Sequence, residues 1–390
     1  MDLFRQRLAK WSKENWLLLA IFLLGLFLRL LGLINIKLAG DNLLHWKIAG
    51  DIVTKGIFPL LGPRASLTGN FNLGPLYYYL LAIPYWLGRG DFRVDIIFFA
   101  VLNSLSIPLL YLTAKRWFSK EQSLKISLLF TVSAYFIQIQ SFPWNPYILP
   151  FFIILCLYFI NKTRQEKLHN FIFLTISYAI CLQLHATTIF LLPVFLYLLP
   201  VRKIPAKYYL LALCVLLAVN FPWIWVNLTT NFSQIHAAIL ILTQGKVEQC
   251  SFVGWLANHG NGERCFWYFR NTLLAFRFLT VSLFGLNSIP LALISLFVIA
   301  YYFIRTKLKE NRYLFVWFLI PLFLFLFYSN DIYLHYFLIL TPVPFFLFVI
   351  FLSKIENLGK RWTIFANVVF VFVILMNLMQ YFWSLQFIRG

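Results

Sequence analysis

The sequence predicts an all-α integral membrane protein, a polytopic bundle of about 11 transmembrane helices. The chain of 390 residues is 61% hydrophobic, 20% aromatic and only 12% charged. Soluble domains are about half apolar and about a quarter charged. Long apolar runs recur along the chain, and the segments joining them alternate between basic and nearly uncharged. That alternation is the pattern that assigns loops to the two sides of a membrane.

The basic residues fix the expected orientation. Cytoplasmic loops keep an excess of Lys and Arg, so we place the N-terminus and the other basic loops inside. Six such segments hold 21 of the 33 basic residues. The net charge of +20 is therefore mostly a sign of orientation and of contact with anionic membrane lipids, and nucleic acid is not an expected partner. The expected location is the plasma (inner) membrane, with several passes and a cytoplasmic N-terminus.

The spans follow one another in a single membrane domain over 1–390. The first, 16–34, is longer than the core of a signal peptide and carries Arg29, so we expect it to stay uncleaved. Two long outer segments, 36–93 and 227–287, interrupt the series. The remaining expected spans are 94–114, 124–140, 146–160, 169–185, 187–200, 208–226, 288–304, 313–328, 332–352 and 362–383.

Two apolar stretches are not expected to cross the membrane. The run 75–87 has a reach of only ~20 Å as a helix, against a hydrocarbon core of ~30 Å. If it crossed, the later basic loops would face outside. We therefore expect a juxtamembrane helix on the outer face. The stretch 268–286, with Arg270 and Arg277 among Phe and Leu, similarly predicts an interfacial amphipathic helix.

The first outer segment has the most informative composition. An acid, Asp41, comes just past the first span and is followed by a short helical stretch that contains His45. A Gly/Pro-rich turn and an aromatic run beginning at Gly74-Pro75-Leu76-Tyr77-Tyr78 come next. This order predicts an interfacial pocket. Chemistry that needs a carboxylate on this side must draw on seven acids: Asp41, Asp51, Asp91, Asp95, Glu248, Glu263 and Asp331.

With these residues the chain resembles the GT-C glycosyltransferases of the protein O-mannosyltransferase and aminoarabinose transferase type (glycosyltransferase family 39-like). Those enzymes carry an Asp, usually followed by Glu, after the first helix, and later a Pro-Pro-Leu-Tyr-Tyr-like helix. Three further motifs follow in the same order and extend the resemblance over most of the chain: Trp144-Asn145-Pro146, Gln183-Leu184-His185, and His335-Tyr336 with Pro342.

The resemblance implies a GT-C-like helical bundle with outer-face juxtamembrane helices. It also implies an inverting enzyme that moves a hexosyl or pentosyl group from a polyprenyl-phosphate carrier to a lipid, glycan or protein acceptor at the outer face. The chain has no nucleotide-binding glycine loop, which fits a lipid-linked donor. The rival class is a lipid-linked-sugar flippase or another transporter. In transporters, charged residues and Gly or Pro residues that interrupt a helix often lie within the spans. Polarity here concentrates in the outer segments, which favours the enzyme.

Asp41 is the residue that the resemblance places in catalysis. A carboxylate within hydrogen-bond reach can take the proton of an acceptor hydroxyl or amine as it attacks. The alternative is an N-cap of a helix that begins at Asn42, because Asp is a preferred capping residue. Both roles are compatible. Asn42 replaces the usual following Glu, so a second carboxylate is missing at that position.

The donor phosphate requires cations. The aminoarabinose transferases have a Lys immediately before the Pro-Pro pair, and this chain lacks it. Arg64 is the best replacement in the segment, because a guanidinium can bind a phosphate bidentately. Lys55 comes second. The alternative for Arg64 is contact with lipid headgroups.

The other candidate binding residues follow from the motifs. His45 and Tyr78 belong to the first outer segment, where the tyrosines are expected contacts of the carrier lipid. The resemblance places His335 and Tyr336 near the lipid-phosphate site. His185 could instead be a structural histidine at the end of its span. Asn145 stands where many relatives carry an Asp.

The cysteines divide by side. Cys250 and Cys265 share the second outer segment, and we expect them to form a disulfide if the compartment is oxidising. A metal site that combines them with His259 and Glu263 has a spacing that matches no zinc signature. The sequence therefore supports no metal and no certain cofactor.

Overall fold

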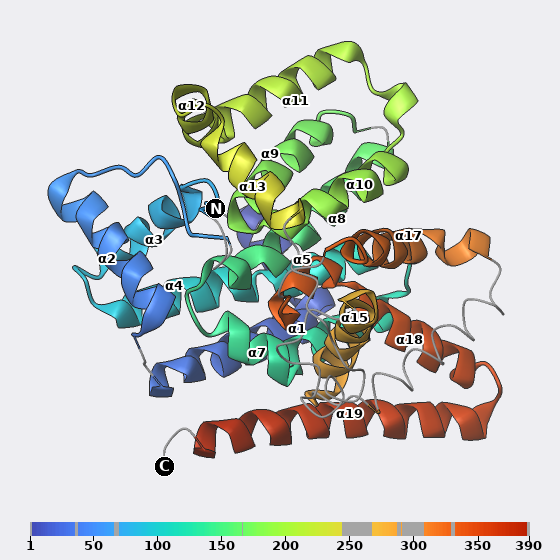
Figure 1. Cartoon of the computed structure of the whole chain (residues 1–390). Helices are drawn as coiled ribbons and strands as arrows, with labels where there is room; N and C mark the ends of the chain where they lie inside the picture. Colours follow the sequence, from blue (N-terminus) through green and yellow to red (C-terminus); the bar gives the residue numbers. More distant parts are fainter. Residues whose placement is uncertain are drawn as a thin grey trace, which may run out of the picture.

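The computed structural model describes residues 2–35, 38–65, 70–165, 167–243, 267–286, 290, 308–328 and 332–387. Within these ranges the chain is a bundle of helices (Figure 1). Four helical stretches are long and apolar enough to cross a membrane: Asn15–Ile34, Phe92–Ala114, Asn145–Arg164 and Lys360–Leu385. They match, within a few residues, the spans predicted at 16–34, 94–114, 146–160 and 362–383. The chain is thus a multi-pass membrane protein.

Two further predicted spans are present as bent pairs of helices. The stretch 208–226 consists of α11 (Ala206–Val219) and α12 (Phe221–Thr229), which meet at 70°. The stretch 332–352 consists of the 3-10 helix η5 (Leu334–Leu340) and α18 (Val343–Glu356), at 60°. A proline lies in the first turn of both second helices, where its missing N–H costs no intrahelical bond. The described residues thus hold up to six spans by length and composition, and the total of 11 stays a prediction.

The remaining helices pack around these spans. The N-terminal helix α1 lies against α4 and α6, α8 pairs with α9, and α18 lies against α19. Their bounds are α1 (Asp2–Leu30), α4 (Phe92–Ser104), α5 (Ser106–Ala114), α6 (Lys120–Val132), α7 (Ala134–Gln140), α8 (Leu149–Arg164), α9 (Asn170–Leu184), α10 (Leu192–Leu198), α13 (Ser233–Thr243), α15 (Trp267–Phe284), α17 (Leu308–Phe325) and α19 (Lys360–Phe387).

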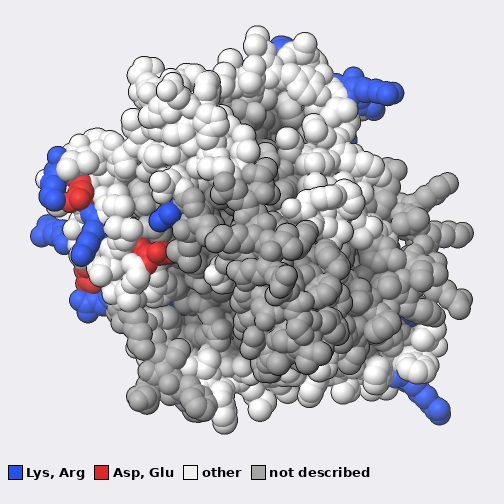
Figure 2. All heavy atoms as spheres, in the orientation of Figure 1, with Lys and Arg blue, Asp and Glu red and all other residues white. Residues whose placement is uncertain are grey.

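The first outer segment forms two helices at one end of the bundle. They are α2 (Gly40–Lys55) and α3 (Leu76–Leu87), which pack against each other. In Figure 1 they lie on the left, where α19 also ends. Figure 2 shows acidic side chains on this face of the molecule only toward the left, over the same helices, whereas basic side chains also appear at the opposite edge.

The prediction of an interfacial helix at 268–286 is wrong. The helix α15 covers this stretch, but it is buried and packs against α7, α17, α18, α19 and η5. Arg270 is only 7% exposed. The amide of Asn271 donates to the carbonyls of Phe325 (2.8 Å) and Tyr328 (2.7 Å). Arg270 in turn donates through Nε to Oδ1 of Asn271 (3.2 Å), so its guanidinium is held inside the bundle where α17 ends.

A buried cation joins the first span to α7. The guanidinium of Arg29 is fully buried and donates through Nε (3.0 Å) and Nη2 (2.6 Å) to Oε1 of Gln140. Its Nη1 donates to the carbonyl of Gly25 (3.1 Å), and the group lies 5.6 Å from the centre of the Phe130 ring. Charged groups within spans are buried in the bundle and paired in this way because their desolvation is costly.

The helix α3 is too short to cross a membrane. Its 12 residues rise about 18 Å, and Pro84 interrupts its hydrogen bonding. The turn at Gly88–Gly90 then leads into α4, which Asp91 caps by accepting from the backbone N–H of Arg93 (3.0 Å). The length agrees with the predicted juxtamembrane helix, for which we expect Gly90 on the outer side.

We expect cysteine labelling to place this turn outside the cell. Gly90 itself has a φ of +84°, which strains any side chain, so the better probe is Arg93→Cys, whose side chain is 67% exposed. In a variant without the five native cysteines, an impermeant thiol reagent should label it in intact cells. Lys360→Cys, in a basic loop, is the matched control that should label only after permeabilisation. The reverse pattern would overturn the topology.

Candidate active site

A cavity of about 620 Å³ lies beside the first turn of α2. Segments distant in sequence line it: α2, the loop before α3, α3 itself, the 3-10 helix η2 (Asn145–Ile148) with the residue before it, the residues that follow α9, and η5 with the residue before it. Eight of the nine residues predicted for catalysis or binding are among its lining residues: Asp41, His45, Arg64, Tyr78, Asn145, His185, His335 and Tyr336. The structure thus brings together residues that are up to 295 positions apart.

Asp41 lies inside the first turn of α2 and not before it. The helix begins at Gly40, with Ala39 as the residue before it, and no side chain caps this end. The expectation of an N-cap before Asn42 is therefore wrong. The carboxylate is exposed at the helix N-terminus, where the macrodipole favours a negative charge.

The other outer acids are arranged differently. Asp51 forms an ion pair with Lys55 (2.7 Å), and Asp91 with Arg93 (2.8 Å). Asp95 is fully buried and does not line the cavity. Glu248, Glu263 and Asp331 lie outside the described residues, as do Cys250 and Cys265. Among the described outer acids, Asp41 is the one that borders the cavity.

His45 is held between two tyrosines. Its ring centre is 5.4 Å from that of Tyr77 and 5.4 Å from that of Tyr78. Burial lowers the pKa of His45 to about 4, although the nearby Asp41 carboxylate acts in the opposite direction. Burial, and then the Asp41 charge, raise the pKa of Tyr78. At neutral pH, His45 is therefore an uncharged imidazole and Tyr78 an uncharged phenol, both within electrostatic reach of Asp41.

His185 follows α9, and Thr187 holds its ring at Nδ1. The backbone nitrogen of Thr187 lies 3.3 Å from Nδ1, and the Thr187 hydroxyl lies 2.8 Å from it. The same hydroxyl lies 3.2 Å from the carbonyl oxygen of Tyr336, which joins the residues after α9 to η5. These contacts fix the position of the His185 ring on the cavity wall.

Aromatic rings form the wall beside His185. The His335 ring lies 5.5 Å from that of His185, 5.0 Å from that of Trp144 and parallel to that of Tyr333 at 5.7 Å. Trp144 and Tyr333 also line the cavity but were not among the predicted site residues. In the sequence, only their position next to predicted site residues could have identified them. Trp144 directly precedes Asn145, and Tyr333 precedes His335 by two residues.

Two polar residues of the predicted motifs, Gln183 and Asn145, form hydrogen bonds that join the elements around the site. The Gln183 Oε1 accepts from the backbone N–H of Leu76 at the start of α3 (3.0 Å), and its amide donates to the carbonyl of Val219 at the end of α11. The Asn145 amide donates to the carbonyl of Leu184 (2.8 Å). These bonds join the ends of α3, α9, α11 and η2 around the cavity.

Arg64 lies in a loop whose two ends are joined by backbone hydrogen bonds. The backbone N–H of Gly62 donates to the carbonyl of Leu73 (2.8 Å), and the backbone N–H of Leu73 donates to the carbonyl of Pro63 (2.9 Å). A Cβ added to Gly62 would collide with the carbonyl of Gly74, so only glycine permits this approach. The Asn72 backbone is in turn held by the side chains of Gln234 (2.8 Å) and Trp223 (3.0 Å). The described residues on both sides of this loop, 62–65 and 72–74, therefore have a fixed position at the cavity edge.

Lys55 is the one predicted site residue that the structure places elsewhere. It lies 14 residues after Asp41, about 21 Å along the axis of α2, and does not line the cavity. It pairs with Asp51 one turn earlier. The prediction that Lys55 serves as a second phosphate contact is therefore not supported.

A second cavity of about 850 Å³ adjoins the first. Asp41 and Trp144 line both. The other lining residues come from the end of the first span, from α2, from α7 with the segment that follows it, from η2 and from the end of α19: Gly32, Asn42, Gln138, Ile139, Ser141, Phe142, Tyr147, Tyr381, Trp383, Ser384 and Leu385. The carboxylate of Asp41 thus lies on a wall that two cavities share. In the described part of the chain, His, Cys, Asp and Glu side chains form no group of three suited to a metal ion.

Comparisons with known proteins confirm the resemblance. Residues 72–225, less than half of the chain, match the family model described as dolichyl-phosphate-mannose-protein mannosyltransferase. No curated protein sequence matches the chain.

Solved structures share the fold. The ArnT crystal structure from Cupriavidus metallidurans, bound to undecaprenyl phosphate, is similar with a TM-score of 0.55 and 15% identity, over 92% of this chain and 63% of that one. The Archaeoglobus fulgidus oligosaccharyltransferase, tethered to an acceptor peptide, is similar with a TM-score of 0.53 and 14% identity, over 95% of this chain and 55% of that one. The chain thus has the fold of GT-C glycosyltransferases and spans less than two thirds of the length of either relative.

Proposed function

We propose that the chain is an inverting glycosyltransferase that uses a polyprenyl-phosphate-linked sugar as donor and acts at the outer face of the membrane. The observation that carries the proposal is the cavity shared by Asp41, Arg64, His185 and His335. It combines an exposed carboxylate, a guanidinium and neutral ring donors within an aromatic lining. A lipid-linked sugar phosphate offers the matching groups.

The proposed step is a single displacement at the anomeric carbon. The acceptor hydroxyl or amine attacks this carbon, and Asp41 takes the proton that the acceptor loses. The bond between the anomeric carbon and the phosphate oxygen breaks, and the polyprenyl phosphate leaves with the electron pair. In this step Arg64 and His185 stabilise the negative charge that develops on the phosphate, and their shared position on the cavity wall supports that role.

The two cavities support separate places for the two substrates. The cavity with Arg64 and the histidines suits the donor phosphate, and the neighbouring cavity suits the acceptor. Asp41 borders both, as a base that joins the two substrates must. The ArnT structure contains undecaprenyl phosphate and the oligosaccharyltransferase structure an acceptor peptide, which supports a lipid-linked donor and a separate acceptor here.

The rival proposal, a transporter, requires a pathway that reaches both sides. The cavities that contain Asp41 lie at one end of the bundle. A third cavity, described below, lies at the other end and shares no lining residue with them. Fully buried aromatic residues such as Phe130, Phe136 and Phe337 fill the core. This arrangement favours the enzyme.

The direct test is a transfer assay with purified protein. A panel of polyprenyl-phosphate sugars is offered together with envelope extracts as acceptors, and the sugar transferred is followed by mass spectrometry. Transfer with inversion at the anomeric carbon supports the proposal. Movement of a lipid-linked sugar across proteoliposome membranes without transfer would support the transporter instead.

Arg64→Ala is expected to raise the KM for the donor about tenfold or more with a smaller effect on kcat. The reason is the loss of charge-assisted hydrogen bonds to the phosphate, each of which is worth about 1.5–3 kcal/mol. Lys55→Ala is the matched control, because Lys55 lies in the same segment but off the cavity, and its KM should stay within about twofold. A raised KM for Lys55→Ala with an unchanged one for Arg64→Ala would reverse the assignment.

A further inference from the structure

A third cavity, of about 300 Å³, lies at the opposite end of the bundle from the candidate active site. The helices α8 and α18 connect the two ends. Asn145 and Tyr336 precede these helices and line the first cavity, whereas Leu157 of α8 and Ser353 and Lys354 of α18 line the third. The turn between α5 and α6 completes one wall, and α17 another.

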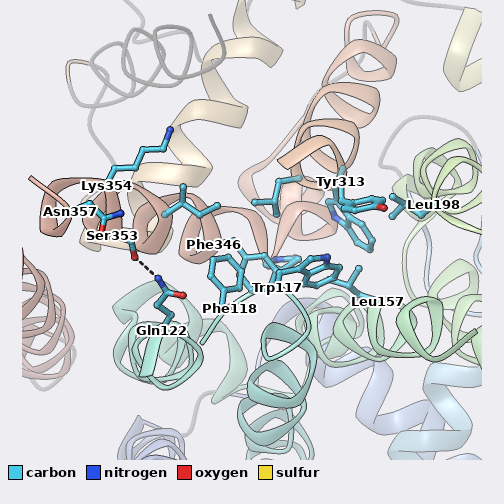
Figure 3. A pocket seen from close by; sticks show the side chains of 14 residues that line it. Trp117, Phe118, Gln122, Leu157, Leu198, Tyr313, Phe346, Ser353, Lys354 and Asn357 are labelled. Carbon is cyan, nitrogen blue, oxygen red and sulfur yellow. Dashed lines mark hydrogen bonds between the residues drawn. The ribbon is translucent and has the colours of Figure 1, made fainter. Parts of the chain in front are cut away.

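The cavity has one apolar part and one polar end. Figure 3 shows the aromatic rings of Trp117, Phe118 and Phe346 in the middle, with Lys354 and Asn357 together at one side. The rings of Trp117 and Phe346 are 6.0 Å apart, and those of Phe118 and Phe346 5.1 Å. The cavity thus offers a hydrocarbon-like interior beside a cation and an amide.

The polar groups at the cavity edge differ in what they already bind. Gln122 donates to the Ser353 hydroxyl (2.7 Å) and is fully engaged in the cap of α6. In the described part of the chain, the indole N–H of Trp117 has no hydrogen-bond partner. Lys354 is exposed at the cavity mouth. A ligand with acceptor oxygens would meet an indole N–H and an ammonium here.

The surrounding charge favours an anion. The segments 115–125 and 354–361 contain seven basic and two acidic residues. Both acids, Glu121 and Glu356, bind Lys125, at 3.0 Å and 2.9 Å.

We propose that this cavity binds an anionic glycerophospholipid from the leaflet that contacts the basic loops. The headgroup phosphate lies at Lys354 and Asn357, and the start of one acyl chain packs against Trp117 and Phe346. Basic pockets between transmembrane helices on the side of the basic loops are a known setting for anionic headgroups. The aromatic interior is the reason to assign a lipid in place of a water-soluble phosphate, because only a lipid supplies hydrocarbon to bury. The proposal does not depend on glycosyl transfer.

The test measures lipid binding to the purified full-length protein after delipidation in detergent. The probes are dioleoyl phosphatidylglycerol, dioleoyl phosphatidylcholine with identical chains, and glycerol 3-phosphate without chains. Native mass spectrometry should show tighter binding of the phosphatidylglycerol than of the phosphatidylcholine. Glycerol 3-phosphate should not bind. Equal binding of the two lipids, or binding of glycerol 3-phosphate alone, would overturn the proposal.

Two variants locate the site. Lys354→Gln should weaken phosphatidylglycerol binding about fivefold, the effect of one surface cation on an anionic lipid, whereas Lys360→Gln, at the start of α19 and outside the cavity lining, should not. Ile350→Trp places a bulky ring in the cavity without changing its charge and should also weaken binding. If both variants bind phosphatidylglycerol as the unaltered protein does, the cavity is not the lipid site.

Discussion

Asp41→Asn is expected to lower the transfer rate about 100-fold or more while the protein folds normally. The substitution keeps the size of the side chain but removes the basic oxygen, and a positioned general base contributes about 10²–10⁴-fold. Since the Asp41 side chain makes no capping hydrogen bond, stability should change by no more than about 0.5 kcal/mol. Single-turnover transfer with saturating donor measures the effect on the chemical step.

The same helix offers a matched control for Asp41→Asn. Asp51→Asn makes the identical change on α2, at a carboxylate that pairs with Lys55 and does not line the cavity. Its transfer rate should remain within about twofold, because an exposed pair contributes little. If Asp41→Asn retains activity within about threefold, Asp41 is not the base.

Gln140→Leu is expected to destabilise the protein by about 3 kcal/mol or more, the cost of leaving a buried charged donor without its acceptor. The change removes the oxygen that accepts both Nε and Nη2 of the buried Arg29 guanidinium. In a chain of this size the apparent Tm should fall on the order of 5–10 °C. Thermal unfolding of purified protein in one detergent measures it.

The double variant separates the charge from the packing. Arg29→Leu combined with Gln140→Leu removes both partners, so much of the lost stability should return, because well-packed apolar residues often replace buried ionic groups without loss. Gln138→Leu, on the same helix α7, is the control and should have a small effect, since its amide bonds to Ser384 at an exposed site. Equal losses for the single and double variants would show that shape, not charge, determines the result.

Sequence patterns predicted the fold class and most of the residues that line the cavity, because each pattern lies within a short stretch of the chain. A span is readable from its own length and hydropathy, and Asp41, His185 and His335 each lie at or near an end of such a span. The burial of α15 was not readable, because Asn271 is satisfied by the carbonyls of Phe325 and Tyr328, 54 and 57 residues away. The interaction of Arg29 with Gln140 spans 111 residues and is likewise invisible locally.

The prediction for Lys55 failed for a different reason. Its partner Asp51 lies four residues earlier, a spacing that favours an ion pair on a helix. The pattern was therefore present in the sequence but was outweighed by the expectation of a phosphate contact. Trp144 and Tyr333 show the reverse case. They line the cavity, yet aromatic residues are so frequent in this chain, at 20%, that composition could not single them out.

The wall common to the two cavities has a consequence for side reactions. Because Asp41 and Trp144 border both cavities, a bound donor leaves the carboxylate facing the second cavity whether or not an acceptor fills it. In the proposed reaction, a water molecule there would lose its proton to Asp41 in the acceptor's place, and the sugar would be released by hydrolysis. The loss of sugar to water would then depend on how completely the acceptor displaces solvent from that space.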